Sequence, residues 1–189
     1  MTVRRISEAR ERILATADRL FYDEGIHAVG IQRIVDEAAV TRVTLYRHFP
    51  SKDDLVSTYL SRRADHDHAQ VDGIIAAHPD DPRTALTELA TALTRDDFAG
   101  ISRGCPFINA SAEYPDASSR VRVAVREHRA WFRDELRGAL EAAGRPDPSG
   151  AAAALVLLRD AALVGGYLDG PDAMRDTFVE TARTVAGLS

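Results

Sequence analysis

The feature that most constrains the fold is a segment near the N-terminus, residues 25–55, GIHAVGIQRIVDEAAVTRVTLYRHFPSKDDL. Apolar residues recur at helical spacing between positions 31 and 38, which predicts a short helix. Positions 39–40 interrupt that pattern, and the Thr41 hydroxyl can cap a second helix that runs to Phe49. Two short helices joined by a tight turn, the second polar on its outer face, suit the major groove of DNA.

The second of these helices is expected to turn Thr41, Arg42, Thr44 and Arg47 outward and to bury Val43, Leu45 and Phe49. Its N-terminal half enters the groove first in such motifs. An arginine there can form a fork to guanine O6 and N7, and a threonine can touch a thymine methyl group or a phosphate. The alternative interpretation is a charged, solvated face with Tyr46 packed in the core.

The rest of the chain also predicts helices. A first helix is expected over about 7–24, with Gly25 ending it, and Ser51-Lys52-Asp53-Asp54 reads as a capping box that starts a long helix. Pro148 and Pro171 stand where first-turn prolines belong, so the last two helices are expected over about 148–166 and 171–187. No strand-like alternation, repeat or low-complexity tract appears. The predicted fold is therefore all-α.

The motif T-x-x-T-L-Y-R-H-F-P-S-K-D-D-L resembles the DNA-binding domain of TetR-family transcriptional regulators, over about residues 8–60. The resemblance implies an N-terminal three-helix helix-turn-helix domain, 1–55, and a helical effector-binding and dimerisation domain, 56–189. The family usually carries glycine where this chain has Ala39, because positive φ is easiest for glycine. Either the turn closes without positive φ here, or Ala39 bears a small strain.

The resemblance also implies phosphate contacts at the positions of Tyr46, His48 and Lys52. Lys52 and the free amides at the start of the fourth helix would make an anion site. Lys52 is also the only lysine of the chain. The residues expected to contact DNA are Gln32, Thr41, Arg42, Thr44, Tyr46, Arg47, His48 and Lys52.

The distribution of charge is compatible with such a contact. The net charge is −5, but residues 1–50 hold eight arginines and seven acidic residues, whereas residues 51–189 hold sixteen basic and twenty-two acidic residues. The acidity therefore lies away from the proposed reading surface, which is the outer face of the predicted helix 41–49 that is expected to contact DNA. A weakly charged reading surface predicts modest non-specific affinity for DNA.

Several classes of protein are not expected. No nucleophile–base pairing, glycine-rich phosphate loop or metal spacing stands out, so we expect no enzyme, no cofactor and no metal site. The Asp65-His66-Asp67-His68 run suggests a metal, but neighbours at i and i+2 point to different sides of a helix, which favours a solvated stretch. The most apolar segment, 151–168, is broken by Arg159 and Asp160, so no membrane span is expected. The single cysteine and the absence of a signal-peptide pattern suit the bacterial cytoplasm.

Aromatic and apolar residues spread over several helices suggest a ligand cavity, with Asn109 and Glu113 as possible polar anchors. The alternative is that these aromatic residues simply fill the core. Cys105 could be a redox sensor beside Arg103, although a small packed side chain is the preferred interpretation. The candidate effector-binding residues are Tyr59, Phe98, Cys105, Phe107, Asn109, Glu113, Trp131 and Tyr167.

The last two predicted helices are the candidate dimer interface. Residues 151–164 are apolar nearly all round, so one face can pack the body while another needs cover, and the last helix carries a matching stripe. The candidate dimerisation residues are Leu157, Ala161, Val164, Met174, Phe178 and Ala182.

Together these patterns predict a homodimeric repressor that binds a palindromic double-stranded DNA operator and is released by a small-molecule effector. One alternative is a constitutive or redox-responsive helix-turn-helix regulator without such an effector. An alternative of another class is a small-molecule-binding or enzymatic helical protein with a non-functional helix-turn-helix domain.

Overall fold

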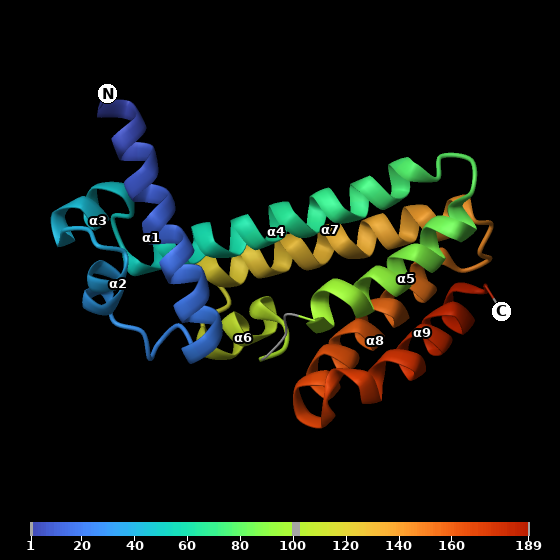
Figure 1. Ribbon diagram of the computed structural model, residues 1–189. Coiled ribbons are helices and arrows are strands. Elements are labelled where there is room, and N and C mark those ends of the chain that lie inside the picture. Colours follow the sequence, from blue (N-terminus) through green and yellow to red (C-terminus); the bar gives the residue numbers. More distant parts are fainter. Residues whose placement is uncertain (1, 100–102, 189) are drawn as a thin grey trace. The chain divides into compact units, whose positions relative to one another are not determined.

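The computed structural model describes residues 2–99 and 103–188, and every regular element in that part of the chain is an α-helix (Figure 1). The predicted all-α fold is therefore confirmed. The first helix begins earlier than expected, at Thr2 rather than at about residue 7. The helices are α1 (Thr2–Glu24), α2 (Ile31–Glu37), α3 (Arg42–His48), α4 (Lys52–Ala77), α5 (Pro82–Ala99), α6 (Pro106–Glu113), α7 (Arg120–Ala142), α8 (Pro148–Asp169) and α9 (Pro171–Ala186).

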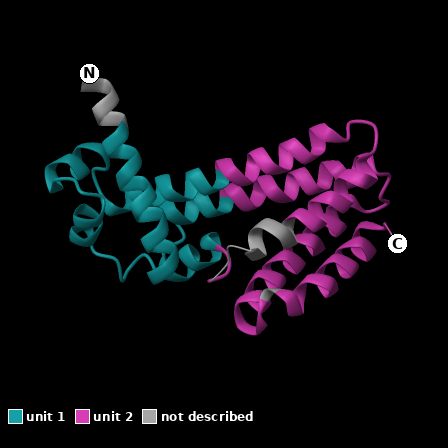
Figure 2. Ribbon diagram, viewed as in Figure 1, with its two compact units in different colours: residues 1–64, 106–126 teal, residues 65–105, 127–189 magenta. Residues whose placement is uncertain are grey.

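These helices pack as two compact units, coloured separately in Figure 2. Unit 1 comprises residues 1–64 and 106–126, and unit 2 comprises residues 65–105 and 127–189. α6 therefore packs with the N-terminal helices, although sequence analysis grouped it with the effector-binding domain. The functional boundaries, 1–55 and 56–189, stay a proposal.

The core of unit 1 is built where α1, α2, α3 and the start of α4 turn their apolar faces to one another. On α1, Ile13, Ala17 and Leu20 recur at helical spacing and have no exposed surface. Gly25 ends this helix with a φ of +95°, and its N–H donates to the Phe21 carbonyl at 3.1 Å. The fully buried partners from the following helices are Ile34, Leu45, Leu55, Val56 and Leu60.

The turn between α2 and α3 contains the one non-glycine residue with positive φ in the described chain, Ala39 at φ +50°. Of the two possibilities that the sequence left open, the structure has the strained one. Ala38 and Val40 close the turn by donating their N–H groups to Ile34 and Val35 carbonyls at 2.9 and 3.2 Å. This turn sets the direction in which α3 leaves α2.

In unit 2, α8 packs most extensively on α9, and α5 lies against both helices. α8 is long and apolar enough to cross a membrane by length and composition, but one of its faces is buried in the unit. Its central polar residues have partners within the unit. The Arg159 guanidinium lies 5.2 Å above the centre of the Phe132 ring, and Asp160 accepts two bonds from Arg129 at 2.9 and 2.6 Å.

The run Asp65-His66-Asp67-His68 lies in α4 and is only partly exposed to solvent. Asp67 lies 3.3 Å from Nε2 of the buried His128, and the His68 ring lies 3.7 Å from the Trp131 ring. His66 instead bonds Gln70 at 2.9 Å on the exposed side. The run therefore divides between two sides of the helix, as its spacing predicts.

Candidate nucleic-acid interface

The outer face of α3 consists of Arg42, Val43, Tyr46 and Arg47, all of which are exposed. Thr41 caps the helix, because its hydroxyl oxygen accepts the Thr44 N–H at 3.1 Å. The two threonine hydroxyls also share a hydrogen bond of 2.8 Å. Both side chains are therefore engaged in starting the helix, and the four outer residues project from it.

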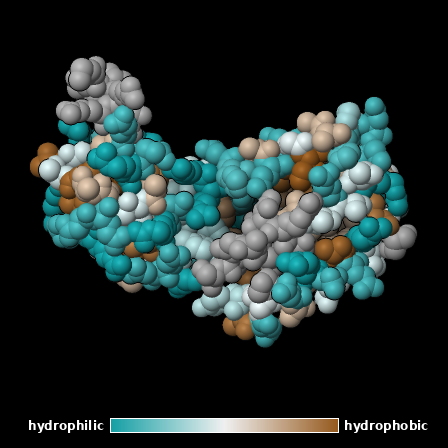
Figure 3. All heavy atoms as spheres, in the orientation of Figure 1, coloured by the Kyte–Doolittle hydropathy of each residue, from teal (hydrophilic) through white to brown (hydrophobic). Residues whose placement is uncertain are grey.

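Val43 is placed differently from the sequence-based expectation, which had it buried. It is the most exposed of the large hydrophobic residues whose side chains the structure describes, at 78%. The reason is helical geometry, since Val43 lies about 200° around the helix from Leu45, which is fully buried. On the face drawn in Figure 3, unit 1 is mostly hydrophilic and its hydrophobic residues stand apart.

Tyr46 lies on the outer face rather than in the core. It is 39% exposed, and the Arg42 guanidinium carbon lies 5.7 Å from the centre of its ring. This cation–π contact holds the guanidinium close to the helix surface and orders a long, flexible side chain. The alternative in which Tyr46 fills the core is therefore wrong.

The remaining residues expected at DNA have three different surroundings. Gln32 is exposed on α2 and bonds Asp36 at 2.8 Å. His48 is half-buried, and burial, followed by the charges of Arg47 and Arg10, lowers the pKa of its imidazole. Its Nε2 atom is buried and has no partner among the described residues. His48 is therefore suited to a neutral hydrogen bond rather than to a cationic contact.

Lys52, at the start of α4, has its ammonium nitrogen 5.9 Å from the centre of the Phe21 ring. Burial lowers the pKa of this lysine, although the negative charges of Glu113 and Asp53 act in the opposite direction. The helix begins with the predicted capping box, in which Ser51 accepts the Asp54 N–H at 3.0 Å and bonds its carboxylate at 2.7 Å.

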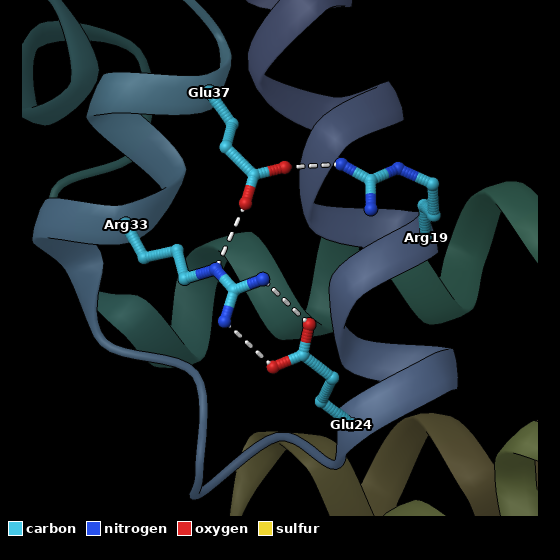
Figure 4. Close-up of polar contacts among 4 residues, drawn as sticks. All are labelled: Arg19, Glu24, Arg33 and Glu37. Carbon is cyan, nitrogen blue, oxygen red and sulfur yellow. Dashed lines mark hydrogen bonds and ion pairs between the residues drawn. The ribbon is translucent and has the colours of Figure 1, made fainter.

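An ion-pair network fixes α2 against α1 (Figure 4). Arg33 bonds Glu24 at 2.9 Å and Glu37 at 2.8 Å, and Arg19 reaches the other oxygen of Glu37. The bond from Arg33, then that from Arg19, lowers the pKa of the Glu37 carboxyl. The network lies between the helices and leaves the outer face of α3 free.

Glu113, predicted as a polar anchor for an effector, instead holds the loop that follows α1. Its carboxylate accepts the backbone N–H groups of Ile26 and His27 at 2.8 and 2.5 Å. Burial opposes the charge, but these bonds outweigh it and lower the pKa of the Glu113 carboxyl. The neighbouring Tyr114 hydroxyl donates to Asp53 at 2.9 Å, so α6 is tied both to the loop and to the start of α4.

The other candidate effector residues do not form one set. Tyr59, Phe107 and Asn109 belong to unit 1, where the two aromatic rings are buried, whereas Cys105, Trp131 and Tyr167 belong to unit 2. Cys105 is buried, as the packed interpretation predicts, and accepts a long contact from Arg159 at 3.9 Å. Tyr167 is 52% exposed. The side chain of Phe98 lies outside the described residues.

An apolar cavity lies in unit 2, between α5, α7, α8 and α9, and its lining residues differ from the candidates that the sequence suggested. The volume inside it that the centre of a water-sized molecule can occupy is about 20 Å³, so in this conformation the cavity is narrow. None of the described residues that line it is charged. Its lining includes Leu86, Leu89, Phe132, Leu136, Leu155 and Phe178. These residues gave no signal in the sequence, because a residue that lines a cavity has the same apolar spacing as one that fills a core.

The candidate dimerisation residues divide by exposure. Leu157 and Val164 are exposed on α8, at 68% and 42%, and Ala161 lies on the same exposed face. Phe178 and Ala182 face the interior of unit 2, where both line the cavity, so the exposed face of α8 has no counterpart at these two positions of α9. These two residues of the apolar stripe of α9 therefore pack inside unit 2.

The helices α1, α2 and α3 form a helix-turn-helix unit. Its turn is fixed, and α3 is capped and exposes two arginines, which are the features of a DNA-binding protein of this class. Comparisons with known proteins identify its family. Residues 13–58 match the model "Bacterial regulatory proteins, tetR family", and residues 82–165 match "Tetracyclin repressor-like, C-terminal domain". The structure is similar to that of SCO4454, a TetR-family transcriptional regulator from Streptomyces coelicolor. That likeness has 42% identity and a TM-score of 0.91, over 96% of this chain and 95% of that one.

The chain belongs to the TetR family of DNA-binding transcriptional regulators. Escherichia coli NemR in its reduced form shares the fold, with 22% identity and a TM-score of 0.79 over 94% of this chain and 96% of that one. The transcriptional activator FasR of Mycolicibacterium smegmatis is 41% identical over 58 residues, which are 31% of this chain and 26% of FasR. The matches to curated relatives thus span about a third or less of those proteins' length.

Proposed function

We propose that the protein is a repressor that binds a palindromic operator as a homodimer and is released by a small molecule. The observation that carries the DNA-binding part is the outer face of α3. Arg42 and Arg47 are exposed there beside Tyr46, on a helix that Thr41 caps and the buried Leu45 anchors. These are the side chains that a helix in the major groove requires for bases and phosphates.

The experiment is selection of bound duplexes from a random pool with the full chain. A two-fold symmetric consensus, with half-sites about one helical turn apart, is the expected result. Failure to enrich any sequence would remove the DNA-binding proposal. A reporter gene placed behind the selected operator then distinguishes repression from activation. The distinction matters because FasR, a relative over the N-terminal region, is named a transcriptional activator.

The proposed dimer uses the exposed face of α8. Leu157, Val164 and Leu168 are 68%, 42% and 70% exposed and lie at helical spacing, with Ala161 between them. A palindromic site needs two copies of the helix-turn-helix domain, and a two-fold interface covers the same face on both copies. Leu157→Glu with Val164→Glu is therefore expected to give folded monomers that sediment at half the mass of the unmodified chain. A folded monomer of the unmodified chain at micromolar concentration would oppose the proposed dimer.

The proposed effector site is the cavity of unit 2, which has room for little more than a water molecule in this conformation and would widen as the effector enters. Because the described residues of its lining offer hydrocarbon surface and no charged group, the effector is proposed to be an uncharged, largely apolar molecule. Ala90→Phe places a bulky ring at the lining and is expected to abolish effector-induced release without changing operator affinity. The probe is a series of uncharged hydrocarbons and aromatic compounds added to the protein–operator complex. Release that survives in Ala90→Phe would place the effector elsewhere.

A further inference from the structure

Val43 occupies the middle of the outer face of α3, and folding does not explain it. With 78% of its surface exposed, the side chain gains little from burial. Valine is also a poorer helix former than alanine, so this position costs stability in the free protein. Single exposed apolar residues are ordinary on protein surfaces, and the significance of this one comes from its neighbours.

Those neighbours are the residues expected to reach DNA. Tyr46 follows Val43 by three positions and Arg47 by four, so both lie beside it on the helix surface. Arg42 precedes it directly and is held over the Tyr46 ring. The hydroxyls of Thr41 and Thr44 are bonded to each other. Val43 lies between these two residues in the sequence and is the exposed aliphatic side chain of this face.

We propose that Val43 reads a thymine by packing its two methyl groups against the C5 methyl of that base. This assignment rests on the proposed function. The thymine methyl is the apolar group that the base edges present in the major groove. Branching at Cβ restricts χ1, so the valine methyl groups are already positioned before DNA binds.

The same contact excludes the other bases. Cytosine at this place presents an amino donor, and the purines present acceptors at their edges. Valine can form no hydrogen bond with any of these groups. Removing them from water against Val43 would therefore cost free energy that no new bond offsets. Because Arg42 and Val43 are adjacent, the thymine is expected within about two base pairs of any guanine that Arg42 reads.

The test removes one methyl group from the DNA. After selection of the operator, each thymine is replaced in turn by deoxyuridine, which lacks only the C5 methyl, and affinity is measured by fluorescence anisotropy. For the unmodified chain, one position in each half-site is expected to weaken binding about fourfold, the effect of one buried methyl group. Val43→Ala is expected to bind the thymine and deoxyuridine duplexes within about twofold of each other at that position.

The controls test whether the thymine contact belongs to Val43 alone and whether the variant folds. Arg47→Ala is expected to weaken binding to every duplex and to keep the thymine-to-deoxyuridine ratio. Val43→Ala is expected to fold, since alanine favours the helix, and a thermal melt checks this. A clear operator without any deoxyuridine-sensitive position, or an unchanged ratio in Val43→Ala, overturns the assignment alone. A pool from which no sequence is enriched overturns the proposed function itself.

Discussion

The outer face of α3 and the cavity of unit 2 are built by opposite means. Around α3, directional contacts fix the backbone, such as the bonds from Arg33 to Glu24 and Glu37 and from the Ile26 N–H to Glu113. These contacts leave the reading surface free. The cavity is enclosed by apolar side chains that pack without directional bonds. Reading bases requires polar groups at fixed positions, whereas an apolar site requires only volume and the exclusion of water.

The largest effect is expected when an apolar side chain is removed from the lining of the cavity. Phe178→Ala should lower the free energy of unfolding by about 3 kcal/mol or more, because Phe178 is 4% exposed and its loss leaves a void. The matched variant is Val43→Ala, which should change it by less than about 0.5 kcal/mol. Urea denaturation measures both. Equal costs for the two variants would contradict the division between a packed lining and a free reading surface.

The next effect concerns sequence discrimination at α3. Arg42→Ala should cost about 1–3 kcal/mol in operator binding per half-site and relax the preference at particular base pairs. Tyr46→Phe, by contrast, should weaken all sites alike, because the lost hydroxyl is expected at a phosphate. Affinity and selected sequence are measured together for each variant. If Arg42→Ala keeps both, α3 does not read the bases through this arginine.

Substitution of Glu113 can show whether its hydrogen bonds hold the loop after α1. Glu113→Gln should lower the free energy of unfolding at pH 7 by about 1–2 kcal/mol, because the carboxylate accepts two backbone N–H groups. The pKa of Glu113 is lowered on folding, so its contribution is present above the ordinary value of 4.5 and is lost as the pH falls through the folded pKa. The two proteins should therefore converge in stability once the pH lies below the folded pKa of Glu113. A difference that does not depend on pH would assign the effect to packing.

The helix-turn-helix could be predicted from sequence because its signals are local. The capping residues Thr41 and Ser51 act on amides three positions away, and both bonds are present. Val43 was misplaced because two positions along a helix nearly reverse the direction of a side chain. The partner of Glu113 could not be predicted, since Ile26 lies 87 residues away in the sequence. The lining of the cavity was not predicted, because apolar spacing does not reveal how completely side chains fill the space between helices.

The proposed phosphate contact of Lys52 can be tested by chemical labelling of its amine, which is partly buried in the free protein. Burial lowers its pKa, which raises the fraction of neutral amine, the form that amine reagents attack. Bound operator should slow labelling of Lys52 severalfold more than labelling of the N-terminal amine, and added salt should reverse this. Lys52→Gln should reduce the salt slope by about one unit per protomer. Labelling that operator leaves unchanged, measured by mass spectrometry, would place Lys52 outside the interface.

The smallest effect is expected at the turn that orients α3. Ala39 has a φ of +50°, a conformation that costs an L-residue about 1–2 kcal/mol and glycine almost nothing. Glycine also loses about 0.5–1 kcal/mol more entropy on folding, so Ala39→Gly should raise the free energy of unfolding by about 0.5 kcal/mol. Ala28→Gly, at an exposed loop position without positive φ, should lower it by a similar amount. Because Ala39 is exposed and contributes little packing, operator affinity should stay the same. If both glycine variants destabilise equally, the turn does not store strain at Ala39.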